Sequence, residues 1–385
     1  MGERWLANHA GDYRGPTFVA VAGMHGNEPA GIEAITRIRE ELEALDPKMS
    51  GTFIGLRGNL KALAAGQRFL DRDLNRRWFD RDVEQLLAKD PAYDGPEDAE
   101  QRELLEILDK LIAGSPGPLV VLDLHSTSSR SAAFTVFSDT LANQPLGFGL
   151  RVPVILGLEE AIEGTMAGWL SDRGHVAIGF EGGQHGDPET TELQVAALWV
   201  GLVTTGLLER NEVPNYGRHL ERLNQSARTF PRAVEILHRH AITPGDGFEM
   251  KPGYVSFQPV AEGEVVATDR GGEIRAPFAG RMMMPLYQGQ GEDGFFLARE
   301  LGPTRLSVSR TLRRVGADRL LPLVPGIERA PGRDDAGSSL RVRGGVSTGP
   351  VRELLRLCGY RRVREDQREF VFSRRRQRGH ARDED

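Results

Sequence analysis

The sequence predicts an α/β fold for residues 1–240, in which helices cover both faces of a central sheet. Within it, residues 17–210 alternate apolar runs typical of buried strands with segments whose apolar residues recur at helical spacing. Such alternation is typical of a sheet flanked by helices. A glycine-rich stretch, 241–300, and an arginine-rich stretch, 301–385, follow with different patterns. A length of 385 residues also favours more than one domain.

Three apolar runs in the first region predict strands that end in polar residues. They cover residues 17–24, 118–125 and 176–181. Helical spacing of apolar residues predicts helices between and after these strands. The predicted helices cover residues 29–45, 99–113, 195–203 and 218–240.

The two later regions predict smaller units. Short β-type runs at 253–258, 264–267 and 294–297 indicate a small β-barrel or sandwich in residues 241–300. In residues 301–385, a helix over 351–358 and a strand over 369–373 predict an α+β extension, while residues 326–349 are low in apolar content and predict a loop.

Composition describes an ordinary soluble protein. The single cysteine, Cys358, excludes an internal disulfide and is compatible with a reducing environment. Residues 1–5 contain no apolar signal-peptide core, and no uncharged apolar run is long enough to span a membrane. We therefore expect a cytoplasmic protein, and a homo-oligomer is compatible with its sequence.

Charge is unevenly distributed along the chain. The formal net charge is −6, yet residues 301–385 contain 20 Arg, no Lys and 11 Asp or Glu. Such a basic segment could bind nucleic acid or an acidic partner. Because its arginines alternate with acids and few aromatic residues lie among them, we instead expect it to pack against the acidic body or to be solvated, without nucleic acid.

Four polar residues lie where the predicted strands end. His25 and Glu28 follow the first strand, His125 ends the second, and Glu181 ends the third. In an open α/β sheet, ligands bind beyond the carboxyl ends of the strands. Two imidazoles and a carboxylate can hold a catalytic zinc ion, and a further carboxylate can act as general base. The alternatives are a hydrogen-bonded core histidine at 125 and a simple loop or helix cap at 181.

The surroundings of these residues favour a rigid site. Gly23 and Gly26 allow a tight turn around the first histidine, and Pro29 suits the start of the helix that follows. Asp123 shares a strand face with His125 and could orient a ligand imidazole, such as that of His25. Capping of a loop amide is the alternative for Asp123.

An Arg- and Asn-rich segment, 58–78, lies between the first two of these strands. Such residues usually decorate a solvated face. In an amide-cleaving site, however, one Arg can stabilise a developing oxyanion. Another can hold a substrate carboxylate through two parallel hydrogen bonds.

Four motifs in this order resemble the succinylglutamate desuccinylase and aspartoacylase family, a branch of the zinc carboxypeptidase-like enzymes. The motifs are residues 23–28, 68–76, 123–125 and 179–183. The resemblance implies a zinc-carboxypeptidase-like α/β/α sandwich with a central mixed sheet as the catalytic domain, residues 1–240. It also implies one Zn²⁺ per chain, with His25, Glu28 and His125 as ligands.

Further roles follow from the same resemblance. Glu181 is implied as the general base that activates the attacking water and later protonates the leaving amine. Arg68 is implied to polarise the scissile carbonyl. Asn75 and Arg76 are implied to bind the α-carboxylate of the amino-acid product, with Asp73 supporting the arginines.

Residues 274–297 resemble part of the small β domain that covers the site in this family. Tyr287 falls where the family has a tyrosine that reaches the substrate; a solvent-exposed tyrosine is the alternative. Aspartoacylases also use an Arg upstream of the catalytic Glu to hold the acyl carboxylate. Arg173 is close to that position but out of register, so the acyl group is left open.

The leading functional prediction is a zinc-dependent amidohydrolase that removes the acyl group from a small N-acyl amino acid. A zinc carboxypeptidase acting on peptides or peptidoglycan fragments is the nearest alternative. A non-catalytic binding protein on the same scaffold is an alternative of another class, and it should have lost a metal ligand or the general base.

Overall fold

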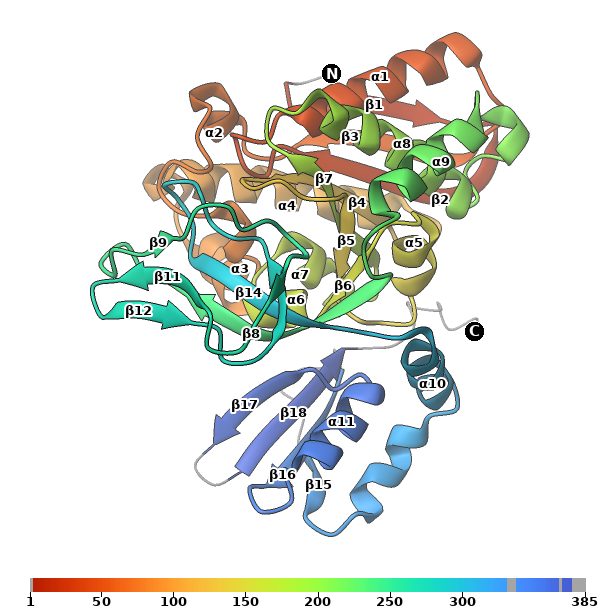
Figure 1. Cartoon of the computed structure of the whole chain (residues 1–385). Helices are drawn as coiled ribbons and strands as arrows, with labels where there is room; N and C mark the ends of the chain where they lie inside the picture. Colours follow the sequence, from red (N-terminus) through yellow and green to blue (C-terminus); the bar gives the residue numbers. More distant parts are fainter. Residues whose placement is uncertain (1–2, 331–336, 367–368, 376–385) are drawn as a thin grey trace.

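A computed structural model describes residues 3–330, 337–366 and 369–375 of the chain. Within these residues, the architecture is mixed α/β around an 11-stranded sheet that contains both parallel and antiparallel pairs (Figure 1). In spatial order its strands are β1 (Trp5–Ala10), β3 (Ser50–Arg57), β2 (Tyr13–Ala22), β4 (Val120–Thr127), β7 (Val176–Gln184), β5 (Phe134–Phe137), β6 (Val154–Leu156), β8 (Ala233–Ala241), β14 (Asp293–Glu300), β13 (Gly280–Met283) and β10 (Pro259–Val260).

Helices cover both faces of the first part of this sheet, as the sequence predicts. Up to residue 227 the helical segments are α1 (Ala30–Leu45), α2 (Leu60–Ala65), η1 (Leu74–Arg76), α3 (Asp80–Ala88), η2 (Pro91–Tyr93), α4 (Pro96–Gly114), α5 (Gln144–Gly149), α6 (Leu158–Ile162), α7 (Met166–Asp172), α8 (Pro188–Thr204), η3 (Arg210–Glu212) and α9 (Tyr216–Ala227). The predicted helices at 29–45, 99–113 and 195–203 are confirmed as α1, α4 and part of α8.

Two buried apolar clusters hold the helices on the sheet. One cluster joins α1, α5, α8 and α9 to one face, with Ile35, Ile38 and Trp199 fully buried. The other joins α3, α4 and α7 to the opposite face around Trp78 and Leu108. Full burial of a large aliphatic or aromatic side chain contributes roughly 1.5–3 kcal/mol, so these clusters fix the strands at the centre of the sheet.

The strands β2, β4 and β7 are parallel neighbours, and their carboxyl ends meet at one edge of the sheet. All eight residues of β4 are buried, because helices cover both of its faces. In the register between β4 and β7, His125 lies opposite Glu181. The fold therefore brings together residues that lie 56 positions apart in the sequence.

The predicted helix over 218–240 is wrong in its second half. α9 ends at Ala227, and β8 occupies 233–241 between β6 and β14. Pro231 separates the two elements. The four residues that begin β8, 233–236, are all buried, because they enter the middle of the sheet rather than its surface.

The region 241–300 supports the predicted barrel or sandwich only in part. A separate three-stranded antiparallel sheet contains β9 (Glu249–Met250), β11 (Val265–Asp269) and β12 (Gly272–Arg275). It shares one buried cluster with β13 and β14, which belong to the main sheet. The region is thus a small sandwich in which strands of the main sheet form one of the two layers. The predicted strand at 253–258 is absent from these described residues.

Residues 301–375 form an α+β unit beside the main body (Figure 1). A four-stranded antiparallel sheet contains β15 (Ile327–Ala330), β16 (Gly337–Arg343), β18 (Glu369–Arg375) and β17 (Arg362–Asp366). α10 (Pro303–Arg314), η4 (Ala317–Leu323) and α11 (Gly349–Leu357) accompany it. The predicted loop at 326–349 is wrong where β15 and β16 lie, because alternating Leu340 and Val342 are buried in this unit's core. Its residues 331–336 lie outside the described part of the chain.

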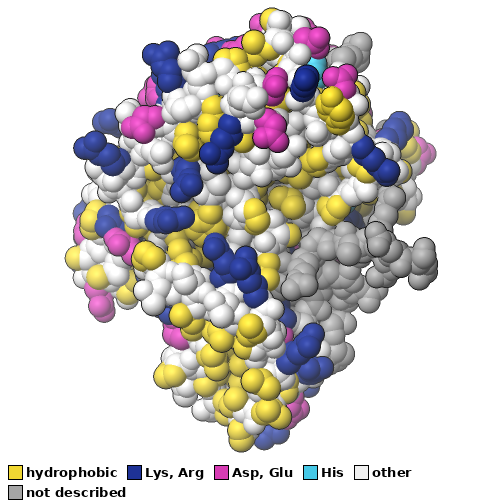
Figure 2. Space-filling view, turned by 90° about the vertical axis from the view of Figure 1, so that its right-hand side faces the viewer, with side chains coloured by type: hydrophobic (Ala, Val, Ile, Leu, Met, Phe, Trp, Pro, Cys, Tyr) yellow, Lys and Arg dark blue, Asp and Glu magenta, His cyan; other side chains and the backbone are white. Residues whose placement is uncertain are grey.

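The domain boundaries at residues 240 and 300 stay predictions, since the main sheet extends across the first of them. In the part of the chain that the structure describes, no helix is long and apolar enough to cross a membrane. Figure 2 shows one face of the molecule, on which Lys and Arg side chains are spread among other residues rather than gathered into one continuous basic patch.

Candidate functional site

A tight turn after β2 places His25 and Glu28 at the carboxyl edge of the sheet. Gly23 adopts a φ of 71°, a left-handed conformation that favours glycine. A Cβ atom on Gly26 would lie 2.1 Å from the carbonyl of Ala62, so only glycine fits against α2 at this point. The turn leads directly into α1, and the site therefore stands on a packed strand and helix.

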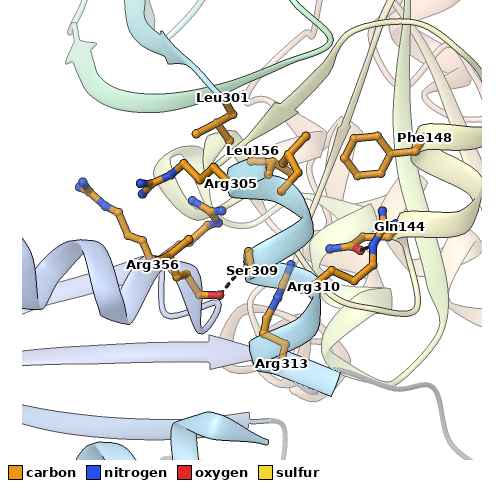
Figure 3. A pocket seen from close by; sticks show the side chains of 12 residues that line it. Gln144, Phe148, Leu156, Leu301, Arg305, Ser309, Arg310, Arg313 and Arg356 are labelled. Atoms are coloured by element: carbon orange, nitrogen blue, oxygen red, sulfur yellow. Dashed lines mark hydrogen bonds between the residues drawn. The ribbon is translucent and has the colours of Figure 1, made fainter. Parts of the chain in front are cut away.

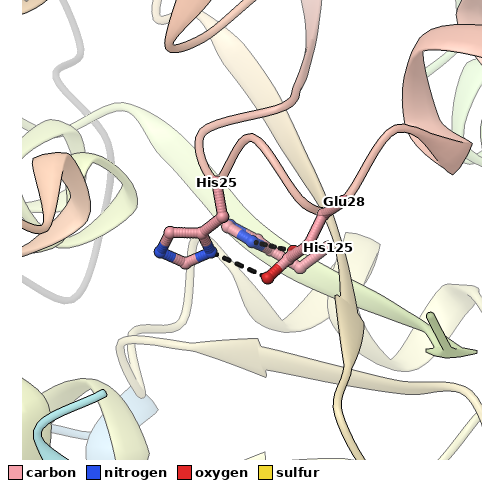
Figure 4. A group of neighbouring side chains, drawn as sticks. All are labelled: His25, Glu28 and His125. Atoms are coloured by element: carbon pink, nitrogen blue, oxygen red, sulfur yellow. Dashed lines mark hydrogen bonds and ion pairs between the residues drawn. The ribbon is translucent and has the colours of Figure 1, made fainter. Parts of the chain in front are cut away.

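His25, Glu28 and His125 converge in a buried cluster (Figure 4). The Nδ1 atom of His25 lies 2.9 Å from Oε1 of Glu28, and Nδ1 of His125 lies 3.0 Å from Oε2 of Glu28. One potential ligand atom from each of the three residues lies within 4.8 Å of the other two. The structure thus brings together the three residues predicted as metal ligands.

A carboxylate holds the second nitrogen of each imidazole. Nε2 of His25 lies 3.1 Å from Oδ1 of Asp73, and Nε2 of His125 lies 2.9 Å from Oδ2 of Asp123. Asp123 therefore contacts the histidine of its own strand, rather than His25. Carboxylates at these positions favour the tautomer that leaves Nδ1 free to bind a metal.

Neighbouring positive charges keep two of these carboxylates ionised despite their burial. Burial tends to raise the pKa of Glu28, but the adjacent His25 and His125 hold this pKa well below its usual range. The pKa of Asp73 is also well below its usual range, because the charges of Arg68 and His25 outweigh the effect of burial. Both side chains are therefore anionic at neutral pH.

Glu181 has a different electrostatic environment. Burial and the nearby charge of Glu28 raise the pKa of Glu181 to about 7, although His125, His25 and Arg68 act against this shift. Its Oε2 atom is buried and has no hydrogen-bond partner among the described residues. A carboxylate whose pKa lies near neutrality can both accept and donate a proton during a reaction.

The segment after α2 brings three more predicted residues to the cluster. Arg68 donates hydrogen bonds of 2.9 and 3.2 Å to Asp73 and lies 3.6 Å from Glu28. Asn75 accepts a hydrogen bond from the backbone of Met166, and its Nδ2 atom lies 3.4 Å from Nε2 of His125. Asp73 therefore ties the arginine to the histidine cluster.

A cavity of about 70 Å³ opens beside the cluster, and Arg68 and Arg76 line it. Ser126 to Ser129 contribute hydroxyl groups, whereas residues of α6 and of the region 284–296 contribute mainly apolar and acidic groups. The covering β region thus contributes part of the cavity wall. The cavity residues from this region and α6 are Leu158, Ile162, Met284, Leu286, Gln288, Gly291, Glu292, Asp293 and Phe296.

Tyr287 and Arg173 are absent from the cavity lining, as are Asn75, Glu181 and the three residues of the cluster. The Tyr287 hydroxyl donates to backbone carbonyls of Lys251 and Tyr254 within the β region, and the residue is 41% exposed. Arg173 pairs with Asp80 and stacks 3.8 Å from the ring of Trp169. Neither residue lines the cavity in this structure.

Three residues of the site were not predicted from the sequence. Glu97 of α4 accepts hydrogen bonds from the backbone of Leu70 and Asp71 and so fixes the loop that carries Arg68. Asp293 pairs with Arg76 at 3.3 Å. His185 lines the cavity and lies 2.7 Å from Ser126 Oγ. Only His185 had a local signal, because it follows the glycines after Glu181.

The donor set fits a zinc ion. Two imidazoles and one carboxylate are a common ligand set of catalytic zinc, which leaves one position open. Both histidines carry the carboxylate partners that orient metal-binding imidazoles. The unpartnered Oε2 atom of Glu181 lies in the same buried region, as expected for a group that acts on a molecule at the open position.

Comparisons with known proteins point to one family. Residues 14–196 match the family model of the succinylglutamate desuccinylase/aspartoacylase catalytic domain. The chain is 35% identical over 80 residues to a succinylglutamate desuccinylase of Pseudomonas fluorescens (strain Pf0-1), which covers 19% of this chain and 24% of that protein. It is 30% identical over 110 residues to a probable aspartoacylase of Nostoc sp. (strain PCC 7120), which covers 29% of this chain and 35% of that protein.

A solved structure shares the fold. It is a succinylglutamate desuccinylase/aspartoacylase from Rhodobacter sphaeroides, with a TM-score of 0.54 and 17% identity, covering 75% of this chain and 87% of that one. The curated relatives are matched over well under half of their own length. The predicted resemblance is nevertheless confirmed for residues 14–196, which match the catalytic-domain model of the succinylglutamate desuccinylase/aspartoacylase family.

Proposed function

We propose that this protein is a zinc-dependent hydrolase that removes the acyl group from a small N-acyl amino acid. The observation that carries the proposal is the position of Glu181 directly opposite His125, beside the cluster of His25, Glu28 and His125. Ser126, which follows His125, lines the neighbouring cavity together with Arg68 and Arg76. A metal-binding group and a general base thus face the same space. The family of residues 14–196 supports the same reaction class.

His25, Glu28 and His125 would hold the zinc ion. When bound, such an ion acts as a Lewis acid and makes water a strong nucleophile at neutral pH. Asp73 and Asp123 orient the two imidazoles through their second nitrogens.

Glu181 moves the proton in the proposed reaction. Its carboxylate accepts a proton from the attacking water and donates it to the amide nitrogen as the carbon–nitrogen bond breaks. A pKa of about 7 suits both steps, because neither protonation state is strongly disfavoured. The buried Oε2 atom, which has no hydrogen-bond partner in the described residues, is available for this transfer.

Two arginines would bind the substrate. Arg68, held by Asp73, places positive charge where oxygen of the scissile carbonyl gains negative charge. The Nε atom of Arg76 is buried without a hydrogen-bond partner among the described residues, so it can donate to a substrate carboxylate. Asn75 lies beside Arg76.

The cavity favours a small substrate over a peptide. Its volume of about 70 Å³ leaves room for a small group rather than a peptide chain, and residues 284–296 contribute to its wall. Arg173 lies outside the cavity lining, which leaves the acyl side without that arginine. The identity of the acyl group is therefore left to experiment.

The test is release of free amine from a panel of N-acyl amino acids by zinc-loaded protein, run beside Glu181→Ala. Glu160→Ala is the control, since this residue lies on α6 outside the cavity lining. Turnover that is lost in Glu181→Ala and after chelation supports the proposal. Cleavage of peptides without cleavage of N-acyl amino acids favours the carboxypeptidase. Zinc binding without turnover of N-acyl amino acids or peptides would contradict an enzymatic function.

A further inference from the structure

The C-terminal α+β unit contacts the main body through arginines. At the C-terminal junction, α10 and α11 meet α5 and β6, and Arg310 of α10 donates a 3.0 Å hydrogen bond to Gln144 of α5 (Figure 3). Away from this junction, the end of β18 reaches α7, where Nε of Arg375 lies 2.8 Å from Oδ1 of Asp172. This arginine carries the C-terminal unit towards the elements that support the candidate active site.

Three buried side chains converge beside α7. A Cβ atom on Gly168 would lie 2.8 Å from Oγ1 of Thr165 and 3.0 Å from Oε2 of Glu159. The same position lies 3.1 Å from Nη2 of Arg375. Thr165 donates a 2.5 Å hydrogen bond to Glu159 and accepts a 2.9 Å hydrogen bond from the backbone of Gly168. The missing side chain at position 168 therefore allows the C-terminal arginine to approach this buried pair.

Glu159 of α6 is affected by arginines from both parts of the chain. The pKa of Glu159 is raised, because burial outweighs the opposing charges of Arg375 and Arg76. Of these two arginines, Arg375 has the larger effect. A buried carboxylate destabilises a fold unless positive charge or hydrogen bonds compensate for its lost hydration. The C-terminal unit thus supplies charge that stabilises Glu159 in its buried position.

The turn between α6 and α7 packs against both residues proposed to bind the substrate carboxylate. The backbone of Met166 donates a 2.9 Å hydrogen bond to Oδ1 of Asn75. The carbonyl of Gly164 accepts a 3.0 Å hydrogen bond from the backbone of Trp78. A Cβ atom on Gly164 would lie 2.6 Å from the carbonyl oxygen of Arg76, so the two segments are in direct contact.

This turn depends on its neighbours for its shape. Glu163 adopts a φ of 44° and a ψ of 163°, a conformation that residues other than glycine rarely adopt. Such a backbone persists only where the surrounding contacts impose it. The hydrogen bond from Thr165 to Glu159 is one of these contacts, and it lies two residues further along the chain. Loss of the positive charge beside Glu159 should therefore loosen the turn.

We propose that Arg375 is a positioning residue, through which the C-terminal unit holds the substrate-binding segment in place. It acts through Glu159 and Thr165, whose turn contacts the segment that carries Asn75 and Arg76. The C-terminal unit thereby sets the affinity of the active site for the substrate carboxylate. This inference rests on the proposed hydrolase function, in which that carboxylate is assigned to the same segment.

Steady-state kinetics of full-chain variants tests the proposal with the best substrate of the N-acyl amino acid panel. We expect Arg375→Gln to raise KM by roughly tenfold and to change kcat by less than about twofold, because a loosened carboxylate site weakens ground-state and transition-state binding alike. Arg375→Lys should restore most of the affinity, since it keeps a positive charge beside Glu159. Arg343→Gln is the control, because it removes an exposed arginine of the same sheet.

Gly168→Ala tests the same contact without removing a charge. Its methyl group would separate Arg375 from Thr165 and Glu159, whereas alanine itself favours a helix. We expect KM to rise and kcat to change little, as in Arg375→Gln. This variant keeps the proposal testable where Arg375→Gln fails to fold. An unchanged KM in either folded variant would overturn the proposal, and so would a failure of Arg375→Lys to restore affinity.

Hydrogen exchange of the substrate-free chain measures the coupling without any activity. The amides of Met166 and Trp78 form the hydrogen bonds between the turn and the substrate-binding segment. We expect both to exchange faster in Arg375→Gln than in the unmodified chain, and at unchanged rates in Arg343→Gln. Equal exchange in all three would overturn the proposal. Absence of turnover in the unmodified chain would instead contradict the proposed function, so the two failures are distinguishable.

Discussion

The two buried charge clusters of this molecule have opposite imbalances. In the candidate active site, the carboxylates of Glu28, Asp73, Asp123 and Glu181 surround two imidazoles, and Arg68 is the guanidinium within bonding distance of them. At the C-terminal junction, five guanidinium groups share the carboxylates of Asp139, Glu235 and Glu353, counted over the residues the structure describes.

This difference indicates what each cluster is able to bind. Buried charge is costly unless it is paired, so an imbalance that persists in a fold points to a partner of the opposite sign. The acid-rich cluster has the donor atoms of a cation site. The arginine-rich cluster binds the C-terminal unit to the main body through ion pairs that share Asp139 and Glu235.

The largest expected effect on stability comes from removing a carboxylate that two junction arginines share. Asp139→Asn leaves Arg313 and Arg361 without their shared buried carboxylate. Loss of one partner of a buried pair costs about 3–5 kcal/mol. We expect this loss in the free energy of unfolding, measured by urea denaturation of the full chain.

Asp80→Asn is the matched control, because it breaks a pair of partly exposed side chains with Arg173. Such a pair contributes about 0–1 kcal/mol. Equal destabilisation by the two substitutions would show that the junction does not depend on charge balance.

The next largest effect is kinetic and lies in the acid-rich cluster. Arg68→Gln removes the positive charge proposed to face the carbonyl oxygen, and loss of such a group typically lowers kcat by about 10²–10³-fold. Zinc content should stay near that of the unmodified chain. Steady-state kinetics with the best substrate of the panel measures this effect, with the more exposed Arg72→Gln as the control.

A smaller effect, on metal affinity, concerns the carboxylates that contact the second nitrogen of each histidine. Asp73→Asn weakens the orientation of His25, and loss of such a partner typically lowers metal affinity by about 10–100-fold. Competition with a zinc chelator measures the affinity. Asp71→Asn, at an exposed position, should leave it unchanged; a similar loss in both variants would argue against a specific role of Asp73.

The smallest effect is a pH dependence at the junction. Burial tends to raise the pKa of Glu353, but hydrogen bonds from Arg299 and Arg305 lower it to about 2. Because the folded pKa is depressed, this carboxylate stabilises the fold above its ordinary pKa of 4.5, and the contribution is lost as pH falls towards 2.

We therefore expect Glu353→Gln to lower the Tm by about 1–2 °C at pH 6, the size expected of partly exposed pairs. The difference from the unmodified chain should shrink as pH falls from 4.5 towards 2. Glu328→Gln, at an exposed position, serves as the control for thermal melts across this pH range. A difference that stays constant with pH would exclude this role for Glu353.

Much of the fold and of the histidine cluster could be predicted because their sequence signals are local. His25 and Glu28 lie within one turn, and apolar runs identify the strands that end at His125 and Glu181. Strand β8 was missed because its segment also carries apolar residues at spacings compatible with a helix, and only its pairing with β6 and β14 distinguishes it.

The remaining features depend on partners that are far apart in the chain. Arg76 and Asp293 lie 217 positions apart, and no local pattern links them. The junction was likewise invisible in the sequence, where its arginines look like a solvated basic segment. Their pairing with carboxylates emerges only when Asp139 and Glu235 are placed beside them.

Zinc content of the full chain tests the central claim most directly. The unmodified protein, Glu28→Gln and the exposed control Glu33→Gln are dialysed against zinc and then against buffer, and bound metal is measured by inductively coupled plasma mass spectrometry. We predict one zinc ion per chain in the unmodified protein and in Glu33→Gln, and little or none in Glu28→Gln. Absence of zinc from all three, or equal zinc in all three, would contradict the metal site.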